Sequence, residues 1–105
     1  MVEVVWAESA LRWLRQIHDY IARDNPVAAR GVVQGIVERT AQLAEFPESG
    51  QRVALRGSRD VRVLLYGHYR IAYRLRRRDL VEVVGVHHGA LDIARRLRED
   101  LARGK

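Results

Sequence analysis

The spacing of hydrophobic residues changes near the middle of this chain, and that change restricts the folds it can adopt. In the first half, Ala10, Leu14, Ile17 and Ile21 recur at intervals of three and four residues, as on one face of an α-helix. In the second half, hydrophobic residues alternate with polar ones, as along a β-strand. The chain therefore combines helices with a sheet, which is the α+β class.

Two helices are predicted, joined by a short turn. The first spans residues 8–23. Asn25 can cap the second helix, and Pro26 suits its first helical position, where a missing N–H costs nothing. The second helix ends before Pro47, because the residue preceding a proline is pushed out of helical conformation. Helices joined by so short a turn pack as antiparallel neighbours and form a helical hairpin.

The predicted strands are short and closely spaced. The last three are joined by brief turns, so they form an antiparallel meander. In "YRIAYRLR", Tyr69, Ile71, Tyr73 and Leu75 lie on one face and three arginines and an alanine on the other. A last helical stripe begins at Ala90. The expected fold is one α+β domain, residues 1–105, with an N-terminal strand, a two-helix antiparallel hairpin, an antiparallel β-meander and a C-terminal helix. The predicted strands are residues 2–6, 52–55, 60–66, 69–76 and 80–88.

Positive charge is concentrated in one segment. From Gln51 to Arg78 there are nine arginines and a single acid, Asp60, so this segment carries +8 while the whole chain carries +6. Arginine binds carboxylate and phosphate groups through two parallel hydrogen bonds. The partner is therefore expected to be acidic, either nucleic acid or an acidic protein segment. The alternative is a solvated basic face without a specific partner.

Composition argues against several classes of protein. The chain has no cysteine, so it has no disulfide and no thiolate zinc site. No apolar run approaches the roughly 20 residues that a membrane span requires, and the N-terminal residues do not resemble a signal peptide. The four histidines show no metal-ligand spacing. We expect a cytoplasmic protein with no metal, no cofactor and no membrane association.

A series of short motifs covers almost the whole chain. A first strand ends in Trp6, and "NP.AA" from Asn25, "L..FP..G.R" from Leu43, "YRIAYR" from Tyr69 and "H.A.D" from His88 follow. In this order they resemble the RelE/ParE superfamily of bacterial toxins from type II toxin–antitoxin systems. The resemblance implies one of two activities. RelE-like members cleave mRNA on the ribosome, whereas ParE-like members poison DNA gyrase and have no recognised catalytic site.

The nuclease activity makes the stronger demands on the sequence. Metal-independent RNA cleavage needs a base for the 2′-hydroxyl, cations for the phosphate and an acid for the leaving oxygen. In the RelE-type set that the resemblance implies, Arg62 and Arg70 match, but Leu64 and Gly89 stand where two further cations are expected. His88 matches a histidine that some ribonuclease relatives use. The nuclease interpretation therefore depends on Arg62, Arg70 and His88.

Two adjacent histidines end the last predicted strand. His87 and His88 point to opposite faces, since side chains alternate along a strand, so only one of them can lie beside Arg70. His88 is either a catalytic group or the residue that ends the strand and supports the following helix, and we favour the structural role. His87 is expected to be structural or exposed. The family motif usually has an arginine at the position of Leu91, so a role of that arginine cannot be transferred.

The ParE-like interpretation is the leading hypothesis, and the predicted C-terminal helix also resembles that branch. It describes a toxin without catalytic residues that binds DNA gyrase and is neutralised by a ParD-like antitoxin in a hetero-oligomer. One alternative is a RelE-like endoribonuclease that acts on the ribosome and mRNA. Another is an inactive homologue that only binds its antitoxin. The residues expected to bind the antitoxin or the target are Arg62, Arg70, Arg74, Arg76 and His88.

Overall fold

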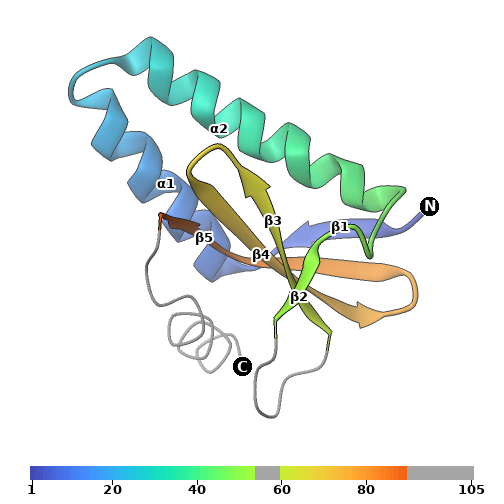
Figure 1. The fold of residues 1–105 in the computed structure, drawn as a ribbon. Helices are drawn as coiled ribbons and strands as arrows, with labels where there is room; N and C mark the ends of the chain where they lie inside the picture. The colour runs from blue at the N-terminus through green and yellow to red at the C-terminus, as the bar shows by residue number, and fades with distance from the viewer. Residues whose placement is uncertain (54–59, 90–105) are drawn as a thin grey trace.

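A computed structural model describes residues 1–53 and 60–89 of the chain. The predicted order of one strand, two helices and four further strands is confirmed (Figure 1). The predicted C-terminal helix with Leu91, and residues 54–55 of the predicted second strand, lie outside the described residues. The elements are β1 (Glu3–Trp6), α1 (Glu8–Ala22), α2 (Pro26–Ala41), the 3₁₀ turn η1 (Gln42–Ala44), β2 (Gln51–Val53), β3 (Val61–Tyr66), β4 (Tyr69–Arg77) and β5 (Leu80–His88).

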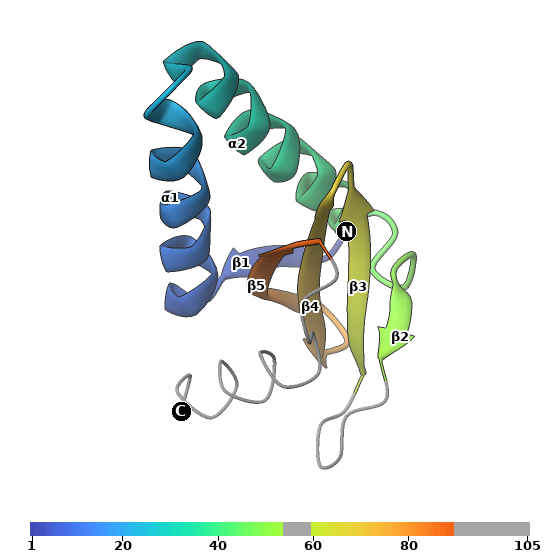
Figure 2. The ribbon, with the colours of Figure 1, turned by 60° about the vertical axis from the view of Figure 1, so that its left-hand side comes forward.

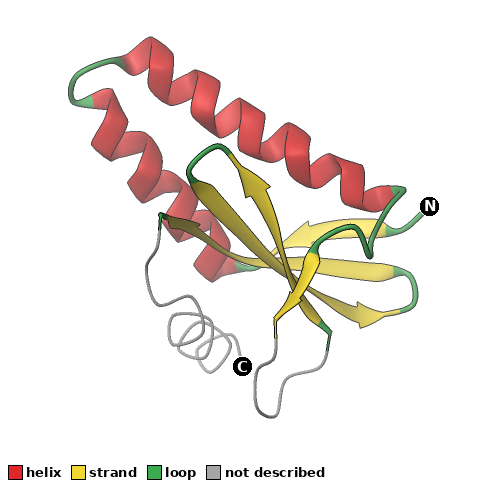
Figure 3. Ribbon diagram, viewed as in Figure 1, coloured by secondary structure: helices red, strands yellow, loops and turns green. Residues whose placement is uncertain are grey.

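The two helices form the expected antiparallel hairpin (Figure 3). The side-chain oxygen of Asn25 accepts a hydrogen bond from the backbone N–H of Ala28 at 3.0 Å, and Pro26 begins α2. The helix ends at Ala41, earlier than Pro47 alone would suggest, because the chain tightens there into η1, as helix C-termini often do. No helix in the described part of the chain is long and apolar enough to span a membrane.

The described strands form one sheet in the order β1-β5-β4-β3-β2. β3, β4 and β5 pair with their sequence neighbours in antiparallel fashion, which confirms the predicted meander. β1 runs parallel to the first part of β5, from Glu3 beside Leu80 to Trp6 beside Val83. The sequence did not predict this long-range pairing, which makes β5 an internal strand.

The contact between β1 and β5 also positions the start of α1. The backbone N–H of Ala7 donates to the carbonyl oxygen of Val83 at 2.8 Å. At the second residue of the helix, the buried hydroxyl of Ser9 donates to the carbonyl oxygen of Val84 at 2.8 Å. α1 therefore begins against the middle of β5, and its second half extends over the end of that strand.

Both helices cover the same face of the sheet, and the main core lies between the two layers (Figure 2). Ile36 of α2 and Ile71 of β4 are fully buried there, whereas Leu14 of α1 is half-buried and packs against the same cluster. Alternation along β4 holds as predicted. The residues of β4 in or against this core are Tyr69, Ile71, Tyr73 and Leu75.

The other face of the sheet carries a smaller apolar cluster. Val61, Ala72 and Val84 are buried in it, with Val53 and Val63 packed against them. Val63 lies directly across from Ala72 in the β3–β4 register, which assigns both to the face opposite the main core. Both faces of the sheet therefore carry buried apolar residues, with the larger cluster on the face that the helices cover.

Candidate functional site

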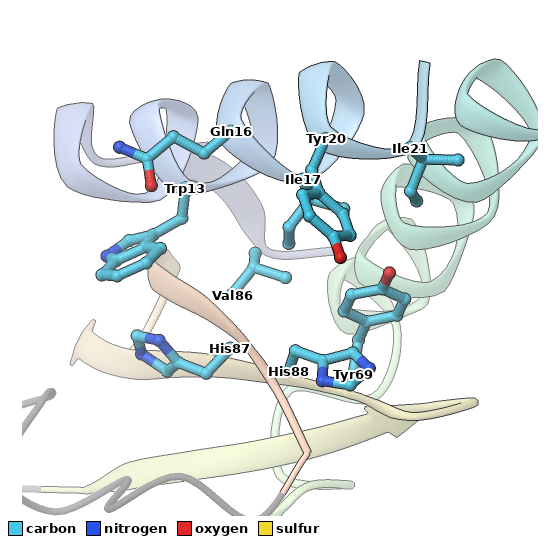
Figure 4. Close-up of a pocket in the computed structure, with 9 residues that line it drawn as sticks. All are labelled: Trp13, Gln16, Ile17, Tyr20, Ile21, Tyr69, Val86, His87 and His88. Atoms are coloured by element: carbon cyan, nitrogen blue, oxygen red, sulfur yellow. The ribbon is translucent and has the colours of Figure 1, made fainter. Parts of the chain in front are cut away.

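A groove separates the second half of α1 from the adjoining ends of β4 and β5 (Figure 4). Its volume is about 470 Å³, which lies within the range typical of ligand pockets. One wall comes from the helix and the other from the sheet. The residues that line the groove are Trp13, Gln16, Ile17, Tyr20, Ile21, Tyr69, Val86, His87 and His88.

The helical wall follows from the spacing of residues along α1. Trp13, Gln16, Ile17 and Tyr20 occur at i, i+3, i+4 and i+7 and therefore share one helix face. Tyr20 is 71% exposed, and the guanidinium carbon of Arg23 lies 5.8 Å from the centre of its ring, a cation–π arrangement. The sequence interpretation missed this wall. Its signal was an aromatic stripe beside the core stripe, wider than the core alone requires.

The adjacent histidines at the end of β5 have different surroundings. His88 is exposed, and its ring centre lies 5.2 Å from that of Tyr69 and 6.1 Å from that of His68. His87 is only 1% exposed, and its ring packs against Trp13 with 5.2 Å between ring centres. His87 was expected to be either structural or exposed, and its burial against Trp13 assigns it the structural role. His88 ends β5 and remains accessible at the rim of the groove.

Arg70 fixes the backbone where β5 ends. Its Nε donates to the carbonyl oxygen of Gly89 at 2.9 Å, and the N–H of Gly89 donates to the carbonyl oxygen of His68 at 2.7 Å. Gly89 has a φ of +67°, a conformation that glycine adopts without steric strain. The nuclease interpretation needs His88 beside Arg70, but the β4–β5 register places His87 directly across from it.

Arg62 is engaged with the turn that precedes β2. Its Nε pairs with the carboxylate of Asp60 at 3.0 Å. Its Nη1 donates to the carbonyl oxygens of Glu48 and Gly50, each at 3.1 Å. The Arg62 side chain is only 14% exposed. These contacts assign it a structural role in the turn, and little of its guanidinium is accessible to a partner.

The structure does not bring Arg62 and Arg70 together. Arg62 lies directly across from Tyr73, which belongs to the main core, so Arg62 is on the helix-covered face. Arg70 is three residues from Tyr73 on the same strand, so its side chain points to the opposite face. His88 pairs with Tyr69, on the face of Arg62 but at the other end of β4. The three residues of the nuclease interpretation are therefore divided between two faces of the sheet.

Two tyrosines, the buried Tyr73 and the half-buried Tyr69, have raised pKa values. Burial raises the pKa of Tyr73 above its ordinary value of 10.0, while the hydrogen bond from Gly50 and the positive charge of Arg62 act in the opposite direction. Burial alone raises the pKa of Tyr69, in the groove. Both hydroxyls therefore stay protonated near neutral pH. In the groove, Tyr69 is a neutral hydrogen-bonding group.

The other two expected binding arginines share one carboxylate. Glu82 Oε1 lies 2.9 Å from Arg74 Nε and 3.4 Å from Arg76 Nη1. Both lie toward the other end of β4 from the groove, so His88 is the expected binding residue that lines it. Within residues 1–53 and 60–89, no three or more histidine, aspartate or glutamate side chains are grouped to hold a metal ion.

A helical hairpin packed on one face of a largely antiparallel sheet, with a groove between them, defines a toxin domain of the RelE/ParE superfamily. Residues 4–93 match the model of the family described as ParE toxin of type II toxin–antitoxin system, parDE, and the chain belongs to this family. It is thus the toxin of a type II toxin–antitoxin system of the ParDE kind.

Two relatives and one solved structure are similar to this chain. The chain is 40% identical over 83 residues to the Y4kP protein of Sinorhizobium fredii, covering 79% of this chain and 83% of that protein. It is 36% identical over 90 residues to Toxin RelE2 of Caulobacter vibrioides, covering 86% and 98%. Its fold is similar to a chain of the chromosomal ParDE TA system from P. aeruginosa, with a TM-score of 0.70, 21% identity and coverage of 86% and 98%.

Proposed function

We propose that this toxin acts by binding DNA gyrase, without chemistry of its own, and that a ParD-like antitoxin neutralises it. The observation that carries the proposal is the division of Arg62 and Arg70 between opposite faces of the sheet. An RNA-cleaving site needs its cations and its proton-transfer group around one phosphate. Of the three residues in the nuclease interpretation, Arg70 lies on one face of the sheet, and Arg62 and His88 lie on the other.

The residues across from Arg70 strengthen this conclusion. On its face of the sheet, the neighbouring strand β3 presents Leu65 directly across from Arg70, followed by Val63 and Val61. Val61 is buried and Val63 packs in the smaller apolar cluster. On the β3 side, a phosphate held by Arg70 would therefore meet aliphatic side chains where a second cation is needed. Apolar surroundings suit a protein partner better than a charged reacting phosphate.

The groove provides the contact area that neutralisation by an antitoxin requires. Its aromatic and aliphatic lining suits the apolar side of a partner segment that folds on binding. The basic charge of the chain suits acidic residues in the same segment. A ParD-like antitoxin with an acidic and apolar tail has this chemistry, and it forms a hetero-oligomer with the toxin.

Supercoiling by purified gyrase tests the proposal. Added toxin should inhibit supercoiling and accumulate cleaved DNA, and toxin mixed beforehand with its antitoxin should have no effect. The matched control is toxin without gyrase, which should leave the plasmid intact. Unimpaired supercoiling at a large molar excess of folded toxin would contradict gyrase as the target.

A second function is favoured by one comparison, the 36% identity to Toxin RelE2. A RelE-like endoribonuclease would act on mRNA at the ribosome, and Arg70 with His88 would be its residual polar groups. Mapping of mRNA 5′ ends after expression distinguishes the two activities, because the nuclease gives cuts in register with the ribosome and no DNA damage. An inactive homologue would give neither result and would still bind its antitoxin.

A further inference from the structure

The end of the β4–β5 hairpin gathers three arginines, of which only Arg76 is among the residues expected to bind the antitoxin or the target. Arg76, Arg77 and Arg78 are consecutive in sequence, and all three are exposed. The sheet residues that line the groove lie at the other end of the same two strands, which Figure 1 shows along their whole length. The eight residue steps from Tyr69 to Arg77 span about 27 Å of extended strand. A partner seated in the groove therefore leaves the hairpin end uncovered.

A β-bulge contributes to this exposure. Leu75 pairs with Val81 and Arg77 with Leu80, so β4 contains one residue more than β5 between the two pairs. The extra residue is Arg76. A bulge interrupts the regular alternation of side chains and redirects the bulged residue. Together with the turn that follows, it lets three successive arginines reach solvent.

The positive charge at this end is only partly compensated. Glu82 forms ion pairs with both Arg74 and Arg76. Asp79 pairs with Arg77 at 3.3 Å, but the two side chains are 74% and 68% exposed, and such pairs exchange readily with solvent and other ions. Arg78 has no ion pair among the described residues. In contrast, Arg62 and Arg70 donate to backbone carbonyls elsewhere in the fold.

We propose that this hairpin end is a binding surface for the phosphate backbone of double-stranded DNA, with contacts from Arg76, Arg77 and Arg78. Arginines supply charge and bidentate donors for phosphate. A two-stranded β-ribbon also has a width that the major groove of DNA admits. The contacts carry no base recognition, so binding is independent of sequence and sensitive to salt.

Exposed side chains favour DNA over an acidic protein segment as the partner. The large hydrophobic residues exposed in the described part of the chain all lie outside residues 74–82. A protein segment that orders on binding needs apolar surface to offset its lost conformational entropy. Phosphate contacts need only cations and released counterions. Residues 74–82 themselves offer cations and no exposed large hydrophobic residue; the exposed apolar side chain beside them is that of Met1, two residues before Glu3, which pairs with Leu80.

DNA binding by the toxin alone tests this inference without gyrase, so its failure is separate from a failure of the proposed function. Fluorescence anisotropy with a labelled duplex, at several salt concentrations, gives the affinity and its salt dependence. The double variant Arg76→Ala/Arg78→Ala should weaken binding about tenfold at low salt. The slope of log K against log salt concentration should also become less negative, by about 0.9 for each lost phosphate contact. Asp79→Asn should tighten binding, because it removes an opposing carboxylate.

The matched control is Arg15→Ala/Arg30→Ala, which removes the same charge from exposed positions on the two helices. It should retain most of the affinity and the salt slope. If both double variants weakened DNA binding equally, net charge alone would explain the effect. The assignment of the hairpin end as the DNA-binding surface would then be overturned. The absence of binding at low salt by a protein whose circular dichroism shows it folded would also overturn it. Binding of polyglutamate but not DNA through Arg76 and Arg78 would identify an acidic polypeptide as the partner instead.

Discussion

The hydroxyl of Tyr73 donates a hydrogen bond to the carbonyl oxygen of Pro47 at 2.9 Å, which ties the middle of β4 to the turn before β2. The same hydroxyl accepts a hydrogen bond from the backbone N–H of Gly50 at 2.8 Å. Arg62 donates to two carbonyl oxygens of this turn from the adjoining strand. One tyrosine and one arginine thus hold a segment that has no regular secondary structure.

Replacing Tyr73 with phenylalanine should destabilise the fold. The Tyr73→Phe change removes both hydrogen bonds and leaves the buried N–H of Gly50 without its acceptor, which costs about 1–3 kcal/mol. Urea unfolding followed by circular dichroism measures the change. Tyr20→Phe is the matched control, because Tyr20 is 71% exposed and should change stability by less than about 0.5 kcal/mol. Equal stabilities for the two variants would show that the turn is held without Tyr73.

The raised pKa of Tyr73 predicts a loss of stability at alkaline pH. Folding holds the phenol neutral, so its pKa is higher in the folded chain than the ordinary value of 10.0. The raised pKa contributes to the free energy of unfolding. This contribution is fully present below about pH 10 and is lost as the pH rises through the folded-state pKa, because the unfolded chain releases the proton first. Urea unfolding between pH 8 and pH 11 should show a steeper decline for the wild type than for Tyr73→Phe. Parallel declines would disprove this linkage.

Two glycines of α2 should respond in opposite ways to alanine. A Cβ at Gly35 would overlap the ring and hydroxyl of Tyr66, whereas a Cβ at Gly31 would meet no atom within 4 Å. Gly35→Ala should cost about 1–3 kcal/mol through overpacking. Gly31→Ala should stabilise the protein by up to about 1 kcal/mol, because alanine favours the helix. Thermal melts of the pair measure both effects, and a stabilised Gly35→Ala would mean that the half-buried Tyr66 ring moves aside without cost.

Charge reversal at Arg70 should weaken the complex with the antitoxin. If acidic residues of the partner approach the sheet arginines, Arg70→Glu replaces attraction with repulsion and should reduce affinity by at least about tenfold. Isothermal titration calorimetry of toxin and antitoxin gives the value. Arg70→Gln also loses the hydrogen bond to Gly89 but introduces no negative charge, so it separates the charge effect from any change in the backbone. Unchanged affinity for Arg70→Glu would locate the antitoxin surface elsewhere.

The two histidines should differ in how their loss affects toxicity. His88→Ala should leave killing largely intact, because a binding toxin needs no proton-transfer group, and this ring is exposed. His87→Ala should reduce the amount of folded toxin, since His87 is 1% exposed and packs on Trp13. Growth, DNA breaks and mRNA ends should be followed after expression without antitoxin. A folded His88→Ala protein that has lost ribosome-phased mRNA cleavage would establish the nuclease instead.

Periodicity was sufficient to predict most local structure. A hydrophobic repeat of 3.6 residues indicates a helix with one buried face, and a repeat of two residues indicates a strand with one buried face. Both helices and the meander were therefore predicted within a few residues. The parallel pairing of Glu3–Trp6 with β5 depends on segments more than 70 residues apart. No turn or spacing encodes such a contact locally. The bulge at Arg76 was equally hidden, because an extra residue in one strand is visible only against its partner.

The candidate site was harder to predict because sheet register decides which side chains meet. The nuclease interpretation placed Arg62 and Arg70 in one site because both match the RelE-type set, but a shift of one residue in strand register moves a side chain to the opposite face of the sheet. The tight turn at Gly67 and His68, which sets Tyr66 across from Tyr69, carried the needed information. Counted from that turn, Leu65 and not an arginine lies beside Arg70.

Because β1 pairs with β5, the sheet cannot be completed until the ribosome has synthesised most of the chain. Residues 3–6 leave the ribosome early, but their partners at residues 80–83 follow only after roughly 4 to 15 seconds of further synthesis, at about 5–20 residues per second. Until then, Ala7 and Ser9 lack the acceptors on Val83 and Val84 that orient α1. The groove has one wall during that interval. A partially synthesised toxin therefore presents its helices before it has a surface with which to act.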